Sequence, residues 1–273
     1  MVIRELLREL SACCGENGEF EARELFMHAS GMTMTEVVLN RGSEVDAETE
    51  DRVRQLVKRR ISGEPLQYIT GTAEFMGLEF MVNQYTLIPR QDTETLVEKV
   101  MEYAAEGAKI LDIGTGSGCI GISLAKYVRN AEVTLSDISV GALDTAKKNA
   151  ENNGVSVNCV RLDILREIPE GKFDIVVSNP PYIETEIIKE LDANVRDYEP
   201  LSALDGGADG LLFYRRITDI APGILKDGGM LAYEIGYNQG EAAGKIVRKV
   251  FGNAQVIKDL CGNDRVIIAK KNG

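Results

Sequence analysis

Seven short apolar segments follow one another along the chain from Lys109 onward, with helical patterns between most of them. One of them, Phe173–Ser178, is a mostly apolar run of the kind that is buried on both faces of a parallel sheet. Strands that alternate with helices form a doubly wound sheet. The sequence therefore predicts an α/β fold with a doubly wound, mostly parallel seven-stranded sheet. The expected strands are 109–113, 132–136, 157–162, 173–178, 229–235, 254–259 and 265–270.

The last two of these strands are joined by a short turn region that contains Gly262 and Asn263. A parallel pair needs a crossover connection of about a dozen residues or more. The available connection is much shorter, so one of the two strands is expected to run antiparallel.

The chain before residue 71 has a helical pattern instead. Apolar side chains recur at helical spacing, for example at Ile3, Leu6 and Leu10. Thr33 precedes Glu36 at the spacing of a capping box. We therefore expect a small N-terminal helical domain over residues 1–70. A domain of this size has little room for chemistry of its own, so recognition of a partner is its expected role.

A connector follows the helical domain. Two apolar runs around Gly77 predict a β-hairpin over residues 71–88. The α/β domain is then expected over residues 89–273, and Asp92 is expected to cap its first helix.

The composition narrows the possible partners and compartments. A formal net charge of −12 works against a nucleic acid as direct partner, because phosphate contacts depend on clustered lysine and arginine. Five scattered cysteines suit reduced thiols in the cytoplasm, and with His28 as the single histidine we expect no metal site. The first residues mix charges into helical spacing and no run reaches membrane-spanning length. We therefore expect a cytoplasmic protein with no signal peptide and no membrane contact.

A glycine-rich turn, Gly114-Thr115-Gly116-Ser117-Gly118, directly follows the strand at 109–113. Glycine tolerates positive φ and lets the backbone approach a ligand closely. The stretch Gly116–Gly121 also matches G-x-G-x-x-G, the dinucleotide fingerprint. Asp137 ends the next strand and can accept hydrogen bonds from ribose hydroxyls in either case. The turn and Asp137 alone therefore leave NAD and other adenosine cofactors open.

Three features favour S-adenosylmethionine over NAD. The turn begins as Asp112-x-Gly114-x-Gly116, which places glycine earlier and tighter than a pyrophosphate-binding turn requires. Asp163 closes the third strand, where an acidic side chain can meet the adenine amino group. The tetrapeptide Asn179–Tyr182 after the fourth strand has no role in hydride transfer.

The tetrapeptide Asn179-Pro180-Pro181-Tyr182 follows the strand at 173–178, and ligands bind beyond the carboxyl ends of such strands. Its prolines fix φ and leave their carbonyls free to accept hydrogen bonds. Asn179 adds a side-chain carbonyl, and Tyr182 adds a flat apolar face. The motif is therefore suited to hold a planar NH2 group. The alternative is an ordinary strand-ending turn, since Asn-Pro is a common turn signal.

The glycine turn together with Asn-Pro-Pro-Tyr resembles class I S-adenosylmethionine-dependent methyltransferases that modify planar nitrogens. The whole chain is similar to the bacterial release factor glutamine methyltransferases. The segments that resemble this family are Gly63–Gly71, Leu87–Glu94, Asp112–Gly118, Ser178–Tyr182, Tyr198–Leu204 with Gly206-Gly207, and Glu234–Gly236. The chain departs from the family pattern at Gln91, where proline is more usual, and at Ile164, where an aromatic residue is frequent.

The resemblance implies transfer of a methyl group from S-adenosylmethionine to the glutamine amide of the Gly-Gly-Gln motif in peptide chain release factors. It implies that Asn179 and Pro180 accept hydrogen bonds from the amide and that Tyr182 packs against the glutamine. The implied catalytic residues are Asn179, Pro180 and Tyr182, and Pro181 joins them in binding the substrate. The implied cofactor-binding residues are Gly114, Thr115, Gly116, Ser117, Gly118, Asp137, Asp163, Ile164 and Asn179.

Three alternatives stay open. An adenine amino-group methyltransferase of DNA or RNA can share Asn-Pro-Pro-Tyr, although the acidic balance and the absence of tryptophan argue against it. A sister enzyme that methylates a glutamine of a ribosomal protein would share the motifs of the catalytic domain. A catalytically silent protein that only binds the methyl donor is opposed by the intact Asn179 and glycine turn.

Overall fold

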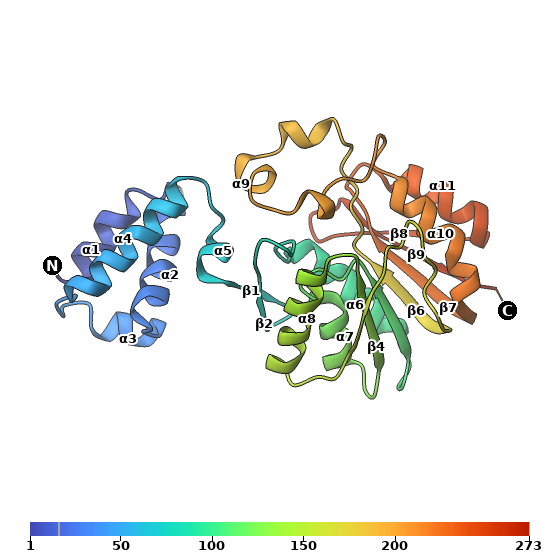
Figure 1. Cartoon of the computed structure of the whole chain (residues 1–273), viewed down its shortest axis with the longest axis horizontal. Helices are drawn as coiled ribbons and strands as arrows, with labels where there is room; N and C mark the ends of the chain where they lie inside the picture. Colours follow the sequence, from blue (N-terminus) through green and yellow to red (C-terminus); the bar gives the residue numbers. More distant parts are fainter. Residues whose placement is uncertain (16, 273) are drawn as a thin grey trace. The chain divides into compact units, whose positions relative to one another are not determined.

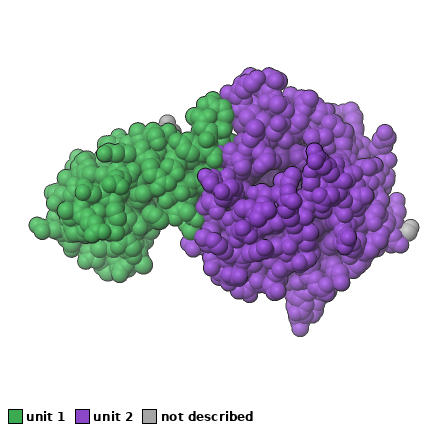
Figure 2. All heavy atoms as spheres, viewed as in Figure 1, with its two compact units in different colours: residues 1–72, 192–198 green, residues 73–191, 199–273 purple. Residues whose placement is uncertain are grey.

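The computed structural model describes residues 1–15 and 17–272, which form two compact units. The first unit comprises residues 1–72 and 192–198, and the second comprises residues 73–191 and 199–273 (Figure 2). Each unit has its own apolar core. In the described part of the chain, no helix combines the length and the apolar character that a membrane crossing needs.

The first unit is helical. The first five of its helices each bury at least one side chain in a common core, which includes Leu6, Phe26 and Val53. At the start of α3, the backbone amide of Glu36 donates to Thr33 Oγ1 at 3.3 Å, and the amide of Thr33 donates to Glu36 Oε2 at 2.8 Å, which confirms the capping box. The helices are α1 (Ile3–Ser11), α2 (Gly18–Ser30), α3 (Met34–Leu39), α4 (Ala47–Ile61), α5 (Leu66–Thr70) and α9 (Ala193–Arg196).

Helix α9 belongs to this unit although it lies far along the chain. The segment 192–198 meets the end of α4, where the Tyr198 hydroxyl donates to the carbonyl of Ser62 at 3.2 Å. The ring of Tyr198 also lies against Gly63. No local pattern in residues 192–198 predicts this pairing, because it depends on a contact between residues more than a hundred positions apart.

The second unit contains a seven-stranded sheet in the order β5-β4-β3-β6-β7-β9-β8 (Figure 1). All neighbours are parallel except β9, which runs antiparallel to both β7 and β8. This confirms the predicted fold class and the expectation of one antiparallel strand near the end. The strands are β3 (Lys109–Ile113), β4 (Glu132–Asp137), β5 (Asn158–Arg161), β6 (Phe173–Ser178), β7 (Leu225–Glu234), β8 (Gln255–Lys258) and β9 (Asp264–Lys270).

Helices cover both faces of the sheet (Figure 1). Successive strand residues point to opposite faces, so Ile110 packs among residues of α6, α7 and α8, while Leu111 packs among residues of α10 and α11. The hairpin of β1 (Thr72–Phe75) and β2 (Leu78–Met81) forms a separate two-stranded sheet. The helices are η1 (Gln91–Thr93), α6 (Glu94–Tyr103), α7 (Cys119–Tyr127), α8 (Val140–Asn152), η2 (Ile187–Glu190), η3 (Leu201–Ala203), α10 (Leu212–Ile224) and α11 (Gly240–Phe251).

The strand order reverses at β3. The chain continues from β3 to β4 and β5 on one side, and it then returns to β6 on the other side. Ile113 and Ser178, the last residues of β3 and β6, are register partners. Ligands of open α/β sheets bind where the strand order reverses, beyond the carboxyl ends of the strands. The glycine turn and the Asn179 tetrapeptide therefore meet at the place where this fold favours a site.

Candidate functional site

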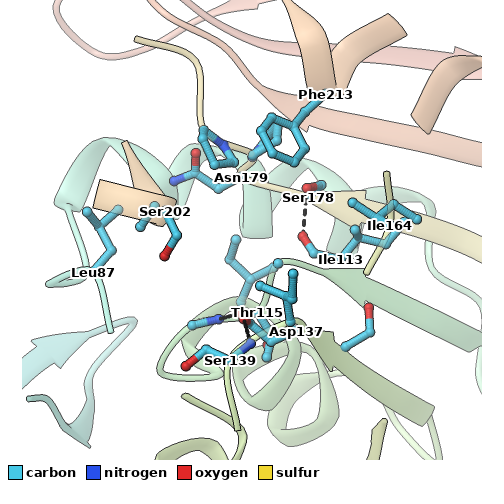
Figure 3. Close-up of a pocket in the computed structure, with 18 of the residues that line it drawn as sticks. Leu87, Ile113, Thr115, Asp137, Ser139, Ile164, Ser178, Asn179, Ser202 and Phe213 are labelled. Carbon is cyan, nitrogen blue, oxygen red and sulfur yellow. Dashed lines mark hydrogen bonds between the residues drawn. The ribbon is translucent and has the colours of Figure 1, made fainter. Parts of the chain in front are cut away.

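A cavity of about 510 Å³ opens beyond the carboxyl ends of β3, β4 and β6, within the second unit. Figure 3 shows Thr115, Asp137 and Ser139 on one side of it and Asn179 on the opposite side. Ile113 and Ile164 lie at a third side, and Leu87 and Ser202 face them. The cavity therefore joins polar groups at the ends of the strands with apolar walls from several loops.

The glycine turn is fixed to the end of β4 by its backbone. The amides of Gly114 and Thr115 donate to the carbonyl of Ser136 at 2.8 and 3.0 Å. The amide of Gly116 donates to Asp137 Oδ2 at 2.9 Å. Gly114 and Gly116 have φ of +71° and +56°, in the left-handed region that glycine adopts without strain.

Asp137 uses each carboxylate oxygen once. Its Oδ2 accepts from the amide of Gly116, and its Oδ1 accepts from the amide of Ser139 at 2.9 Å. Burial raises the pKa of Asp137, while these backbone donors act in the opposite direction. A carboxylate oxygen can accept more than one hydrogen bond, so Asp137 keeps acceptor capacity toward the cavity.

Asp112 lies buried beneath the turn. Its Oδ2 accepts from the Thr115 hydroxyl at 2.6 Å and from the amide of Gly121 at 3.0 Å. Burial raises the pKa of Asp112 to about 7, because water no longer solvates its charged form. Asp112 thus joins the turn to the start of α7 from below and does not line the cavity.

The tetrapeptide after β6 is held from both sides. The Ser178 hydroxyl donates to the carbonyl of Ile113 at 2.7 Å, which ties the ends of β6 and β3 together (Figure 3). Asn179 Nδ2 donates to Thr93 Oγ1 at 3.4 Å. Behind the cavity, Gln239 Nε2 donates to the carbonyl of Tyr182 at 2.9 Å.

Most of the predicted site residues line this one cavity. Two do not. Gly118 is outside the cavity lining and packs against α7. A Cβ added there would be 2.6 Å from Ile122 Cδ1, so its role is close packing. Tyr182, the last residue of the tetrapeptide, is partly buried against the core of the second unit, and its hydroxyl donates to Glu234 Oε1 at 3.5 Å. Those in the lining are Gly114, Thr115, Gly116, Ser117, Asp137, Asp163, Ile164, Asn179, Pro180 and Pro181.

Two loops supply lining residues that the strand pattern did not predict. The segment before α6 contributes Leu87, Pro89, Arg90 and Thr93, and the segment around η3 contributes Leu201, Ser202 and Ala203. Arg90 pairs with the buried carboxylate of Glu199, which ties the two segments together. Both coincide with segments that resemble the family, and that resemblance was the signal that could have identified them.

The expectation that Asp92 caps the first helix of the α/β domain is wrong. Asp92 lies inside η1, and Thr93 precedes α6 without a side-chain cap. The Asp92 carboxylate instead accepts from Arg265 Nη2 at 2.9 Å. Because η1 occupies residues 91–93, the α-helix begins after Asp92. The Asp92 carboxylate pairs with Arg265 of β9 instead of with the helix amides.

Among the described residues, no group of three or more histidine, cysteine, aspartate or glutamate side chains could hold a metal ion. The polar groups that line the cavity are hydroxyls, backbone groups, carboxylates, the Asn179 carboxamide, the Arg90 guanidinium and the Cys119 thiol.

Comparison with known proteins identifies the family. Residues 91–194 match the methyltransferase small domain, and residues 2–71 match the PrmC N-terminal domain. A release factor glutamine methyltransferase of Geobacter sulfurreducens is 42% identical over 253 residues, which cover 92% of this chain and 89% of the relative. The corresponding protein of Moorella thermoacetica is 42% identical over 271 residues, which cover 97% of this chain and 95% of the relative.

Solved structures agree on the fold. A methyltransferase from Pyrococcus furiosus superposes with a TM-score of 0.56 at 20% identity, over 82% of this chain and all of that one. At this identity the likeness shows the fold alone, whereas the relatives in sequence match nearly the full length of both chains. This chain belongs to the release factor glutamine methyltransferase family.

Proposed function

We propose that the protein transfers a methyl group from S-adenosylmethionine to the glutamine amide of the Gly-Gly-Gln motif in peptide chain release factors. The observation that carries the proposal is the position of Asn179 on the cavity wall opposite Thr115 of the glycine turn, with Pro180 next to it in the lining. Relatives that match nearly the whole chain bear the name of this activity.

The cavity residues fit an adenosyl cofactor. Asp137 keeps acceptor capacity for ribose hydroxyls, and nothing lies within 4 Å of the position that a Cβ would take at Gly114 or Gly116. The Asp163 carboxylate, together with Ile164 and Leu162, lies at the part of the lining that suits adenine. Ser117 Oγ is buried without a hydrogen-bond partner among the described residues. We assign cofactor binding to Gly114, Thr115, Gly116, Ser117, Asp137, Asp163 and Ile164, with Gly118 as a packing residue.

The chain's own residues must orient a weak nucleophile. An amide nitrogen is a poor nucleophile, because its lone pair is delocalised into the carbonyl. We assign one N–H of the glutamine to Asn179 Oδ1 and the other to the carbonyl of Pro180. These two acceptors fix the NH2 plane and stabilise the positive charge that develops on nitrogen. Bound S-adenosylmethionine supplies the methyl group as a sulfonium.

No general base is required at the tetrapeptide. With the donor bound, its S–C bond would break as the new N–C bond formed, and one amide proton would then leave to water. The prolines keep the two acceptors rigid, and Tyr182 supports them from behind. Orientation in an apolar cavity can supply several kcal/mol of the barrier reduction.

We assign recognition of the release factor to the N-terminal helical domain, residues 1–70, joined by the hairpin connector to the methyltransferase domain from residue 89. The partner is then a protein, in the cytoplasm, with no direct nucleic-acid contact. The acidic net charge of −12 supports this assignment.

The test is a methylation assay with labelled S-adenosylmethionine and three separate substrates, which are a release factor, ribosomal protein and DNA. A release factor with alanine in place of the Gly-Gly-Gln glutamine is the matched control. Label is expected in the intact release factor alone, and fragment mass analysis should place it on that glutamine. Label in the control or only in DNA would refute the proposal.

A further inference from the structure

Glu234 lies at the carboxyl end of β7, beside the tetrapeptide that follows β6. Ser178 and Tyr233 are register partners, so Asn179, directly after β6, follows the strand end beside Glu234, the last residue of β7, which still pairs with Val266 of β9. The Glu234 side chain is only 2% exposed and is not part of the cavity lining. Its Oε2 has no hydrogen-bond partner among the described residues. Burial of a carboxyl oxygen without a hydrogen-bond partner costs folding free energy, so such a group is rare unless it has a function.

The neighbours of Glu234 connect it to the tetrapeptide by two routes. The Tyr182 hydroxyl donates to Glu234 Oε1 at 3.5 Å. Burial raises the pKa of Glu234, and the Thr93 hydroxyl, close to the Glu234 carboxylate, acts in the opposite direction and lowers it. Thr93 Oγ1 in turn accepts from Asn179 Nδ2 at 3.4 Å. These contacts are long, as such contacts often are before a substrate is bound.

The chemistry of Thr93 gives this chain of contacts a direction. A threonine hydroxyl has one proton to donate, whereas an ionised carboxylate can only accept. When Thr93 donates its proton to Glu234, its oxygen is left as an acceptor. Asn179 then turns its NH2 group toward Thr93, which leaves its carbonyl oxygen for the cavity.

We propose that Glu234 is a positioning residue that acts through Thr93 to hold the Asn179 carboxamide with its oxygen toward the substrate amide. The inference rests on the proposed function, in which Asn179 Oδ1 is an acceptor. Glu234 touches neither substrate nor cofactor, and its effect passes entirely through the orientation of Asn179.

Protonation of Glu234 would weaken this control. Burial raises the pKa of Glu234 to about 7, Thr93 and Arg265 lower it, and Asp92 raises it. A protonated Glu234 can donate to Thr93, and the hydroxyl can then donate to the carbonyl of Asn179 and turn the carboxamide round. The turnover number, kcat, is therefore expected to fall as pH decreases through about 7.

Four other titratable groups near Glu234 keep one charge state across this range. Arg265 on β9 stays cationic: burial lowers its pKa, but Asp259 and Asp92 outweigh that effect and raise it. Tyr182 and Tyr214 stay neutral, because burial raises the pKa of each phenol. Burial also raises the pKa of Cys119 on α7, to about 12.

The first test compares Thr93→Val with Thr93→Ser in the full-length protein, with a release factor as substrate. Valine matches threonine in shape but has no hydroxyl, and serine keeps the hydroxyl. We expect Thr93→Val to lower kcat by about tenfold or more, as misplaced catalytic groups do, while the dissociation constant for S-adenosylmethionine changes little. Thr93→Ser should restore most of kcat. Equal activity of the two variants would overturn the proposal.

The second test is the pH profile of kcat, with both substrates saturating, for the wild type and Glu234→Gln. Asp112 also has a pKa of about 7, so the wild-type profile alone does not identify the group. We expect a decline of wild-type kcat on the acid side of pH 7 and a low, level profile for Glu234→Gln. A full decline that persists in Glu234→Gln would refute the role of Glu234. If Glu234→Gln fails to fold, the Thr93 pair decides.

The proposed methyl transfer and the positioning role of Glu234 would be refuted by different results. A wild-type protein that does not label the release factor would refute the proposed function itself. A wild-type protein that labels the release factor, with variants that match it in kcat and pH profile, would refute only the positioning role of Glu234.

Discussion

The backbone amide of Gly116 donates a 2.9 Å hydrogen bond to Oδ2 of Asp137, so the acid that ends β4 is also part of the glycine turn after β3. Ser139, the N-cap of α8, donates its own amide to Oδ1 of the same carboxylate. One side chain therefore sets the shape of the turn and presents acceptors to the cavity. Substitution of Asp137 is therefore expected to change both the shape of the glycine turn and the acceptors available to the cofactor.

Asp137→Ala should weaken S-adenosylmethionine binding by about 1.5–3 kcal/mol, the range for hydrogen bonds to a charged group. Titration calorimetry of the folded variant measures this directly. Asp144→Ala is the matched control, because Asp144 is an exposed acid on the neighbouring helix α8. Unchanged affinity in Asp137→Ala, with the unfolding transition preserved, would remove Asp137 from the cofactor site.

The buried carboxyl of Asp112 makes stability depend on pH. Its pKa is about 7 in the folded protein and near 4 when unfolded, so between these values the folded state binds more protons. The free energy of unfolding should therefore fall as pH rises from about 4 to about 7, by roughly 1.4 kcal/mol per unit at most, and level off above. Glu234, whose pKa is also about 7, adds a change of the same sign.

Asp112→Asn isolates this contribution. The asparagine oxygen can still accept from Thr115 and Gly121, and the amide has no titrating charge. Urea unfolding at pH 5 and pH 8, followed by circular dichroism because the chain has no tryptophan, should show a smaller loss of stability toward pH 8 in the variant than in the wild type. Asp144→Asn should leave the wild-type difference intact. Equal pH dependence in Asp112→Asn and the wild type would contradict the assignment.

The sheet was largely predictable because each strand is an apolar run with clear ends. The prediction and the structure agree at β6, whereas β7 begins at Leu225, earlier than the predicted 229. Residues 226–229, Lys-Asp-Gly-Gly, have the composition of a loop. They belong to β7 because Leu225 pairs with Phe173 of β6 and the register shifts before Met230 pairs with Ile175, where Lys226 Nζ bonds to Asp174 Oδ2 at 2.7 Å. The local composition of residues 226–229 does not reveal which distant residues they pair with.

The site divides in the same way. Asp137 and Asn179 were identified because they end strands, and the fold brings strand ends together. Thr93 and Glu199 were not, because their places depend on packing between segments distant in sequence. Asp92 was misassigned as a cap for the same reason, since its partner Arg265 lies on β9. Sequence patterns thus predict which residues lie at the strand ends, whereas tertiary contacts determine which residues surround them.

Removal of the N-terminal helical unit should separate cofactor binding from substrate recognition. A chain that begins at Ala73, with residues 192–198 replaced by a glycine-serine linker, lacks the first unit and the segment that packs with it. All lining residues of the cavity remain. It should bind S-adenosylmethionine with an affinity near that of the full chain but methylate release factor poorly. Full activity of this fragment toward release factor would refute the role assigned to residues 1–70.

Asn179→Ala should abolish most methyl transfer while leaving cofactor binding nearly intact. The substitution removes the acceptor Oδ1 and the Nδ2 group that donates to Thr93. The glycine turn and its hydrogen bond to Asp137 stay in place. Loss of one transition-state hydrogen bond of this kind costs about 10²–10³ in rate. Single-turnover transfer to a release factor, at saturating cofactor, measures the chemical step.

Asn179→Asp is the sharper comparison, because it keeps the shape and an acceptor oxygen toward the substrate. It also replaces the NH2 group that donates to Thr93 by a second acceptor, so the Thr93 hydroxyl would have to choose between two carboxylates, those of residue 179 and Glu234. We therefore expect partial activity in the aspartate variant and hardly any in the alanine variant. If Asn179→Ala transfers methyl groups at close to the wild-type rate, the tetrapeptide is only a strand-ending turn and the mechanism is wrong.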